Sequence, residues 1–163
     1  TYEITICDFW CLVSSLVMSY SLSFVGYHQR RKLTRNVVDW FINHQKLNRF
    51  NIFLDINDRR CRNVDGNNGT CGILDDLHRP REFEIEMDNM QSDEDYISTL
   101  LHELTHVEQR VRGKHQYRVG WKDYSKWKGK KIEDNIPYDL LPWEIEAYEQ
   151  EKILTCEYLK TLL

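Results

Sequence analysis

The sequence predicts one α+β domain, because segments with the period of a strand and segments with the period of a helix occur together in a chain of 163 residues. Apolar and polar side chains alternate over residues 49–56 and 82–88, which is typical of half-buried strands. Apolar side chains recur at helical spacing over residues 34–45, 97–111 and 142–162. The length and the 41% hydrophobic content suffice for one core but not for two ordinary domains.

Charge and cysteine content exclude some classes of protein. The net charge is only −4, so the chain as a whole lacks the charge signature of a nucleic-acid-binding or membrane-surface protein. The cysteines are odd in number and irregularly spaced, which favours reduced thiols over a disulfide framework (Cys7, Cys11, Cys61, Cys71 and Cys156). We therefore expect a cytoplasmic protein, and we expect it to be a monomer.

The N-terminal segment carries a competing signal. Residues 9–25 contain no charged side chain and are followed by a basic run at residues 28–32, which is the pattern of a membrane anchor or an uncleaved signal. Serines interrupt the apolar run and Asp8 lies at its edge, so a soluble protein is favoured and an anchor is the alternative. We assign residues 1–26 to an N-terminal hydrophobic segment and residues 27–163 to the domain.

The first half of the chain is expected to supply most of the sheet. Residues 20–25 alternate apolar or aromatic side chains with serine, as a strand does, and Thr34 is a candidate N-cap for the helix that follows. The run at residues 65–69 has strong turn chemistry. It predicts a hairpin between the strand at residues 49–56 and a returning strand at residues 71–74.

The strand at residues 82–88 has one apolar and one acidic face. Its apolar face should be buried (Phe83, Ile85 and Met87). The acidic face then belongs either to a solvated edge strand or to the rim of a cleft that favours basic substrates (Glu82, Glu84 and Glu86).

The strongest motif is His102-Glu103-Leu104-Thr105-His106, which has the pattern H-E-x-x-H within a predicted helix. Two histidines at this spacing lie on one face of a helix, so both imidazoles can reach one Zn²⁺. The glutamate between them is placed to act as the general base of a hydrolase. On a helical wheel the apolar residues gather on the opposite side, so the histidines face away from the core, as a cleft requires.

A zinc site with two histidines needs a third protein ligand if a position is to stay open for water. Glu144 and Glu146 both lie near the start of the last predicted helix. Glu144 falls on the apolar side of the helical wheel, and a carboxylate that packs inward needs a cation to compensate it. We therefore expect His102, His106 and Glu144 to bind zinc, with Glu146 and, less favoured, His115 as alternatives to Glu144.

Residues 110–131 are rich in basic and aromatic side chains (Arg110, Arg112, Lys114, Tyr117, Arg118, Trp121, Lys122, Tyr124, Lys126, Trp127, Lys128, Lys130 and Lys131). Such a segment is typical of surfaces that bind nucleic acid or an acidic polymer. It is equally typical of a hairpin whose rings pack and whose lysines are solvated, with its tight turn at residues 128–130. We favour the hairpin and keep nucleic acid as a less favoured partner.

The last two helices resemble a known family. Residues 102–106 followed by residues 144–148 are similar to the gluzincin-type zinc metallopeptidases, in which H-E-x-x-H is followed on a later helix by a glutamate ligand. Residues 127–129, Tyr138 and residues 141–148 further resemble small uncharacterised bacteriophage proteins classed as metallopeptidases. Gluzincins often carry an aspartate four residues after the ligand glutamate, where this chain has Tyr148.

The resemblance implies a zincin-like α+β fold with a small twisted sheet, an active-site helix that carries H-E-x-x-H, and a C-terminal helix that supplies the glutamate. It implies a zinc-dependent hydrolase of peptide bonds that acts on a peptide or protein, in the host cytoplasm if the gene is viral. An extended substrate would pair with the edge strand, expected at residues 82–88, while Glu103 exchanges protons with water and the leaving amine. Candidates to stabilise the oxyanion are Tyr138, His115, Tyr148 and Tyr117.

Two other functions stay open. The basic segment also makes the chain similar to the SprT-like enzymes, which are proteases associated with nucleic acid. In the other alternative, the metal only supports the fold of a non-catalytic domain.

Overall fold

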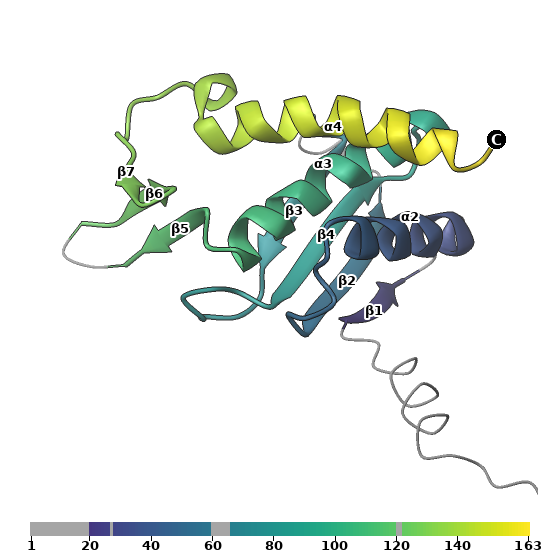
Figure 1. The fold of residues 1–163 in the computed structure, drawn as a ribbon, viewed down its shortest axis with the longest axis horizontal. Helices are drawn as coiled ribbons and strands as arrows, with labels where there is room; N and C mark the ends of the chain where they lie inside the picture. The colour runs from purple at the N-terminus through teal and green to yellow at the C-terminus, as the bar shows by residue number, and fades with distance from the viewer. Residues whose placement is uncertain (1–19, 27, 60–65, 120–121) are drawn as a thin grey trace, which may run out of the picture.

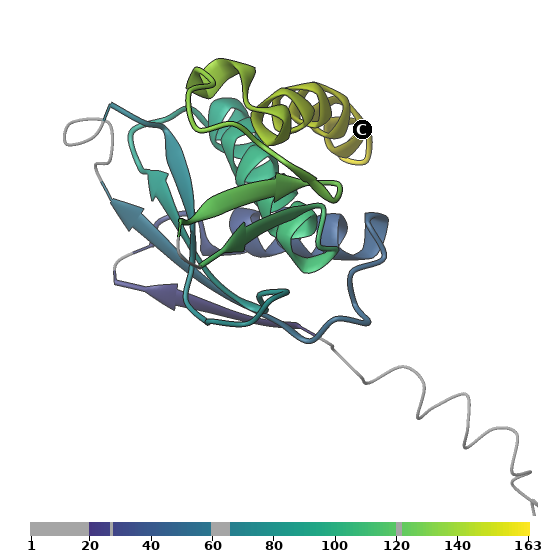
Figure 2. The same ribbon diagram turned by 90° about the vertical axis from the view of Figure 1, so that its left-hand side faces the viewer.

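The computed structural model describes residues 20–26, 28–59, 66–119 and 122–163 as an α+β fold (Figure 1). A four-stranded sheet forms one layer, and α2 and α3 cover one of its faces (Figures 1 and 2). A second, three-stranded sheet projects beside the C-terminal end of α3. The α+β class predicted from the sequence is therefore confirmed.

The larger sheet has the strand order β1-β2-β4-β3. Its strands are β1 (Tyr20–Val25), β2 (Ile52–Arg59), β3 (Gly69–Ile73) and β4 (Glu82–Asp88). The first three in this order are parallel to one another, and β3 is antiparallel to β4. Among the described residues, β3 is therefore the edge strand on the side away from β1.

Two expectations about this sheet are wrong. The returning strand, β3, does not form a hairpin with β2, because β4 lies between them and pairs with both. For the same reason β4 is not an edge strand. The burial of its apolar face explains the arrangement, since Phe83, Ile85 and Met87 are fully buried, whereas β3 is short and contains two glycines.

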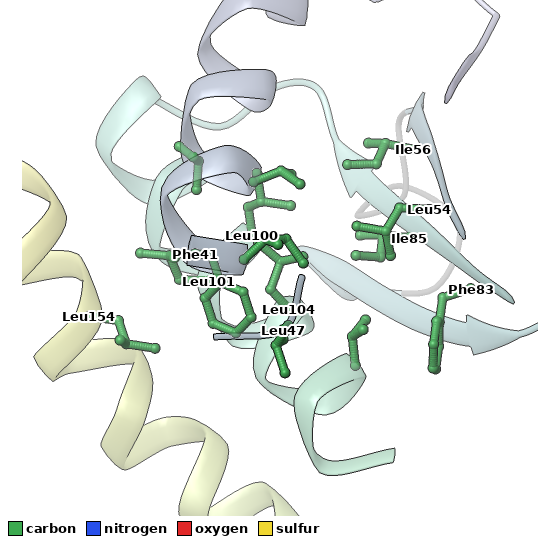
Figure 3. Close-up of a cluster of buried hydrophobic side chains, with 14 of the residues drawn as sticks. Phe41, Leu47, Leu54, Ile56, Phe83, Ile85, Leu100, Leu101, Leu104 and Leu154 are labelled. Carbon is green, nitrogen blue, oxygen red and sulfur yellow. The ribbon is translucent and has the colours of Figure 1, made fainter. Parts of the chain in front are cut away.

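The helices are α2 (Arg31–His44), α3 (Asp93–Val111) and α4 (Pro142–Lys160). Both α2 and α3 pack against the sheet, and α4 packs along α3 (Figure 1). Their apolar side chains share one core with the inward face of the strands (Figure 3). At its centre, Leu100, Leu101 and Leu104 of α3 are fully buried, which fixes the orientation of this helix.

The ends of the helices follow from local chemistry, with one correction. Ser92 caps α3 by accepting a hydrogen bond from the Asp95 amide at 3.1 Å, and Pro142 begins α4. Thr34 does not cap α2, which begins three residues earlier, at Arg31. Its hydroxyl is buried instead and lies 3.1 Å from the Tyr96 hydroxyl, so its role is to satisfy a polar group inside the core.

The predicted hairpin of the basic segment is confirmed. It consists of β5 (His115–Arg118), β6 (Tyr124–Trp127) and β7 (Lys130–Lys131), paired in antiparallel fashion. The turn between β6 and β7 places Lys128 and Gly129 at φ 46° and 84°, as a two-residue hairpin turn requires. A short 3₁₀ helix, η2 (Tyr138–Leu140), then leads into α4.

The expected domain boundary needs a correction at the N-terminus. Residues 20–25 form β1 and pair with β2, so they belong to the domain and not to a separate hydrophobic segment. The remainder of that segment, residues 1–19, lies outside the described residues. Within the part of the chain that the structure describes, no helix is both long enough and apolar enough to cross a bilayer.

The paired strands β2 and β4 offer a matched test of the core. Phe83 of β4 is fully buried, whereas Phe53 of β2 is 52% exposed. We expect Phe83→Ala to lower the free energy of unfolding by about 3–5 kcal/mol, because it opens a cavity between the sheet and the helices. The control, Phe53→Ala, should cost about 1 kcal/mol or less in the same urea titration. Equal losses in the two variants would contradict this packing.

Candidate metal centre

Two histidines from α3 and one glutamate from α4 meet in a cleft. His102 and His106 lie one turn apart on α3, with their Nε2 atoms 3.2 Å apart. Glu144 Oε2 lies 3.5 Å from His102 Nε2 and 3.4 Å from His106 Nε2. One ligand atom from each of these residues therefore falls within 4.8 Å of the other two, which is the compactness that a single metal ion needs.

The sequence of α4 explains why Glu144, and not Glu146, reaches the histidines. Glu144 lies in the first turn on the same face as the buried residues Ala147, Leu154 and Tyr158, and only 4% of it is exposed. Glu146 points toward the β-hairpin, where its carboxylate binds Lys114 at 3.4 Å and Lys128 at 3.0 Å. The structure thus brings together His102, His106 and Glu144 and leaves Glu146 outside.

Both histidines are oriented through their second ring nitrogen. Glu151 Oε2 lies 3.0 Å from His102 Nδ1, and Ser98 donates a 2.6 Å hydrogen bond to the other oxygen of the same carboxylate. On the other side, Gln109 Oε1 lies 3.0 Å from His106 Nδ1. With Nδ1 engaged in this way, each Nε2 is directed toward Glu144, as in many metal sites where a second residue fixes the histidine.

Sequence reasoning missed Glu151 and Gln109. Tyr148 occupies the position where gluzincins often place an aspartate, and its ring packs on His102 at 4.7 Å instead. The carboxylate that binds His102 comes from Glu151, one turn further along α4. The spacing in the sequence could have predicted this contact. Residues seven apart lie on the same face of a helix, so Glu144 and Glu151 share a face of α4.

The charge states of these groups are coupled. Burial acts to lower the pKa of His102, but the neighbouring carboxylates of Glu144 and Glu151 outweigh it and raise the value to about 9. Burial acts to raise the pKa of Glu144, but the neighbouring His102 and His106 lower the value to about 2. A proton on His102 therefore occupies the position that a divalent cation would compete for, and cation binding would release it.

The environment of Glu144 fits a cation. Its Oε2 is fully buried, and no hydrogen bond satisfies it among the described residues. The two histidine nitrogens lie at distances too long for strong charge-assisted hydrogen bonds. A buried carboxylate oxygen that faces two imidazole nitrogens in this way has the donor set and the need for positive charge that a metal ion satisfies.

Glu103 lies beside this triad and faces β3. It is only 6% exposed, and burial raises the pKa of its carboxyl group. The edge strand comes close to it because Gly69 has no side chain. A Cβ atom at position 69 would lie 2.7 Å from the Thr99 methyl group and 3.1 Å from Glu103 Oε1. The glycine thus allows strand and helix to approach each other at the glutamate.

The cleft around the triad has a volume of about 710 Å³. One wall is the edge strand with the residues that lead into it, from Gly66 to Cys71 together with Ile73. The other walls come from α3, from His115 of β5, from η2 and from α4. The acidic face of β4 contributes no residue to this lining, so the alternative in which Glu82, Glu84 and Glu86 form an acidic rim of the cleft is wrong.

The other predicted site residues are divided between the cleft and the surface. Tyr138 and Tyr148 line the cleft, and burial together with the Glu144 carboxylate raises the pKa of both phenols. His115 also lines the cleft, but it stacks on Trp143 at 3.8 Å and stands outside the triad. Burial and the nearby Arg110 lower its pKa to about 3, so its imidazole is neutral. Tyr117 is 54% exposed and does not line the cleft.

Several lysines of the basic segment pair with acids of the same domain. Lys114 binds Glu108 at 2.9 Å, Lys128 binds Glu146 at 3.0 Å, and Lys122 binds Asp134 at 2.7 Å. The hairpin also supports the site, since Trp127 of β6 and Trp143 of α4 both pack against the His115 ring. This arrangement favours the structural interpretation of the segment over a nucleic-acid-binding surface.

Comparisons with known proteins return no relative. No protein-family model, no curated protein and no solved structure matches the chain.

The contact between Glu151 and His102 can be tested by metal affinity. If the triad binds a metal ion, we expect Glu151→Gln to weaken its affinity for added Zn²⁺ by about 10–100-fold, because His102 loses the carboxylate that orients it and raises its basicity. Competition against a chromophoric chelator measures this change. Glu149→Gln is the matched control, since Glu149 lies on the same helix and is exposed. Equal affinities of the two variants would show that Glu151 does not act on the site.

Proposed function

We propose that this chain is a zinc metallopeptidase of zincin-like architecture. The observation that carries the proposal is the position of Glu144 Oε2, 3.5 Å from His102 Nε2 and 3.4 Å from His106 Nε2. Two imidazoles and one carboxylate leave one coordination position open, and this donor set is typical of catalytic rather than structural zinc sites. The three ligands would come from α3 and α4, and their second-sphere partners are Glu151 and Gln109.

The metal and the protein have separate tasks in this proposal. A zinc ion held by such a site supplies Lewis acidity, which polarises a carbonyl group and lowers the pKa of water. Glu103 supplies the base. Its carboxylate faces the cleft next to the triad, takes a proton from the attacking water and delivers it to the leaving amine. Burial raises the pKa of Glu103, which favours the return of the proton.

The substrate would bind along β3, not along β4 as expected from the sequence. Gly69, Cys71 and Ile73 line the cleft, and among the described residues no strand pairs with the outer edge of β3. An extended peptide can add to such an edge through main-chain hydrogen bonds, which would hold its scissile carbonyl near the triad. Because main-chain hydrogen bonds are independent of sequence, this mode suits a peptide or protein substrate.

A further donor is needed for the oxyanion. Tyr138 meets this need best, because it lines the cleft beside Glu144 and its raised pKa keeps the hydroxyl protonated. His115 is the second candidate. Its imidazole is neutral, and its buried Nε2 has no hydrogen-bond partner among the described residues.

Substitution of the base tests the proposal. We expect Glu103→Gln to lower the turnover of casein or of a peptide mixture by roughly a hundredfold or more, because the amide cannot accept the proton of water. Its zinc content should stay unchanged, since Glu103 is not a ligand. Glu94→Gln, an exposed position on the same helix, is the control and should retain full activity. Undiminished turnover in Glu103→Gln would refute the mechanism.

A further inference from the structure

Arg110 is a cation of the cleft that the proposed mechanism does not use. It lies one turn after His106 on α3, and helical spacing of four places its side chain on the side of the helix that carries the histidines. It lines the same cleft as the triad and is partly buried there. The guanidinium forms no hydrogen bond and no ion pair with any residue that the structure describes. Such a group is costly to bury unless a partner compensates its charge.

The next two basic residues in the sequence, Arg112 and Lys114, both bind a carboxylate, in contrast to Arg110. Arg112 binds the Glu108 carboxylate at 2.5 Å and the Gln45 carbonyl oxygen at 2.6 Å. Lys114 binds Glu108 at 2.9 Å. Neither Arg112 nor Lys114 lines the cleft. An unpaired cation is therefore a property of the cleft and not of this end of the helix in general.

The residues around Arg110 do not supply a negative charge. Its neighbours in the cleft are Cys71 and His115. Burial raises the pKa of the Cys71 thiol, which therefore stays neutral, and His115 is neutral as well. A position in the last turn of α3 gives Arg110 a favourable interaction with the helix dipole, but that interaction is available to a side chain in solvent and does not require the cleft.

Arg110 also faces the path that the proposed substrate would take. Cys71 belongs to β3, and the charges of Glu103 and Arg110 both act on its thiol. Ile73 lines the cleft at the next position on the same side of the strand. A peptide laid along β3 past Glu103 would therefore pass Arg110 as well. The planar guanidinium offers paired donors that match a carboxylate in geometry and charge.

We propose that Arg110 is a specificity-determining residue that binds a carboxylate of the substrate, either an acidic side chain near the scissile bond or the free C-terminus of the peptide. This inference rests on the proposed function, because it assigns the substrate class of the same cleft. Both sources present a carboxylate to the guanidinium, but they imply different cleavage specificities. An acidic side chain would make the protein an endopeptidase with acidic preference, whereas a bound C-terminus would restrict cleavage to chain ends.

The test uses short N-acetylated peptides that carry a single glutamate, moved position by position, and matched peptides with glutamine. Each peptide is made with a free and with an amidated C-terminus. Calorimetry measures their affinity for the zinc-loaded Glu103→Gln protein, which keeps the proposed ligands but cannot turn the peptide over. The same titrations are made with Arg110→Met and Arg110→Lys in this background. Lys130→Met is the control, since it removes one exposed positive charge outside the cleft.

We expect one carboxylate-bearing series to bind about tenfold or more tightly than its neutral counterpart when Arg110 is present. The preference should disappear in Arg110→Met, fall in part in Arg110→Lys and persist in Lys130→Met. The series that shows it identifies the source of the carboxylate. An equal preference in Arg110→Met, or no preference in any series, would overturn the proposal.

Cleavage of the same peptides by protein with intact Glu103 separates this inference from the proposed function. If the intact protein cleaves the peptides and Arg110→Met shows the same preference among them, the peptidase proposal stands and the role of Arg110 in binding the carboxylate is rejected. If the binding preference depends on Arg110 but the intact protein cleaves none of the peptides, the carboxylate site is supported and the proposed peptidase activity is rejected.

Discussion

The buried carboxylate of Glu144 is the constraint on which the arrangement of the helices depends. A carboxylate that is only 4% exposed is costly to bury without positive charge, and Glu144 Oε2 faces the Nε2 atoms of His102 and His106 at the point where a cation would supply that charge. This requirement fixes how α4 lies on α3. Two further contacts hold α4 against α3. They are the Glu151–His102 contact and the 2.9 Å hydrogen bond from the Gln109 amide to the Trp143 carbonyl oxygen.

The division of α3 into two faces gives the domain both its core and its cleft. Leu100, Leu101 and Leu104 anchor the helix to the sheet, so the opposite face is held rigidly while it presents His102, His106 and Arg110. The edge strand β3 closes the cleft from the side, and Gly69 allows it to approach Glu103. The proposed ligands, base and substrate edge thus come from elements that are packed against one another, which is the preorganisation that the proposed hydrolysis needs.

The sequence predicts the parts of this site that depend on local periodicity. The phase of α3, the inward face of α4 that selects Glu144, and the turn at Lys128 and Gly129 all follow from spacing within one element. The strand order does not follow from spacing within one element. The alternation in β4 specifies which of its residues are buried but not which strands are its neighbours. Glu151 was missed because the known family pattern directed attention to position 148, and the isolation of Arg110 emerges only when the partners of the other basic residues are known.

The most direct test of the account compares the zinc content and affinity of Glu144→Gln and Glu146→Gln. The two substitutions are chemically identical and lie two residues apart on α4. The account predicts about one zinc ion per chain in the wild type and in Glu146→Gln, and a loss of affinity by orders of magnitude in Glu144→Gln, which removes one of three protein ligands. Wild-type affinity in Glu144→Gln would contradict it, because the histidines would then bind the metal without this carboxylate.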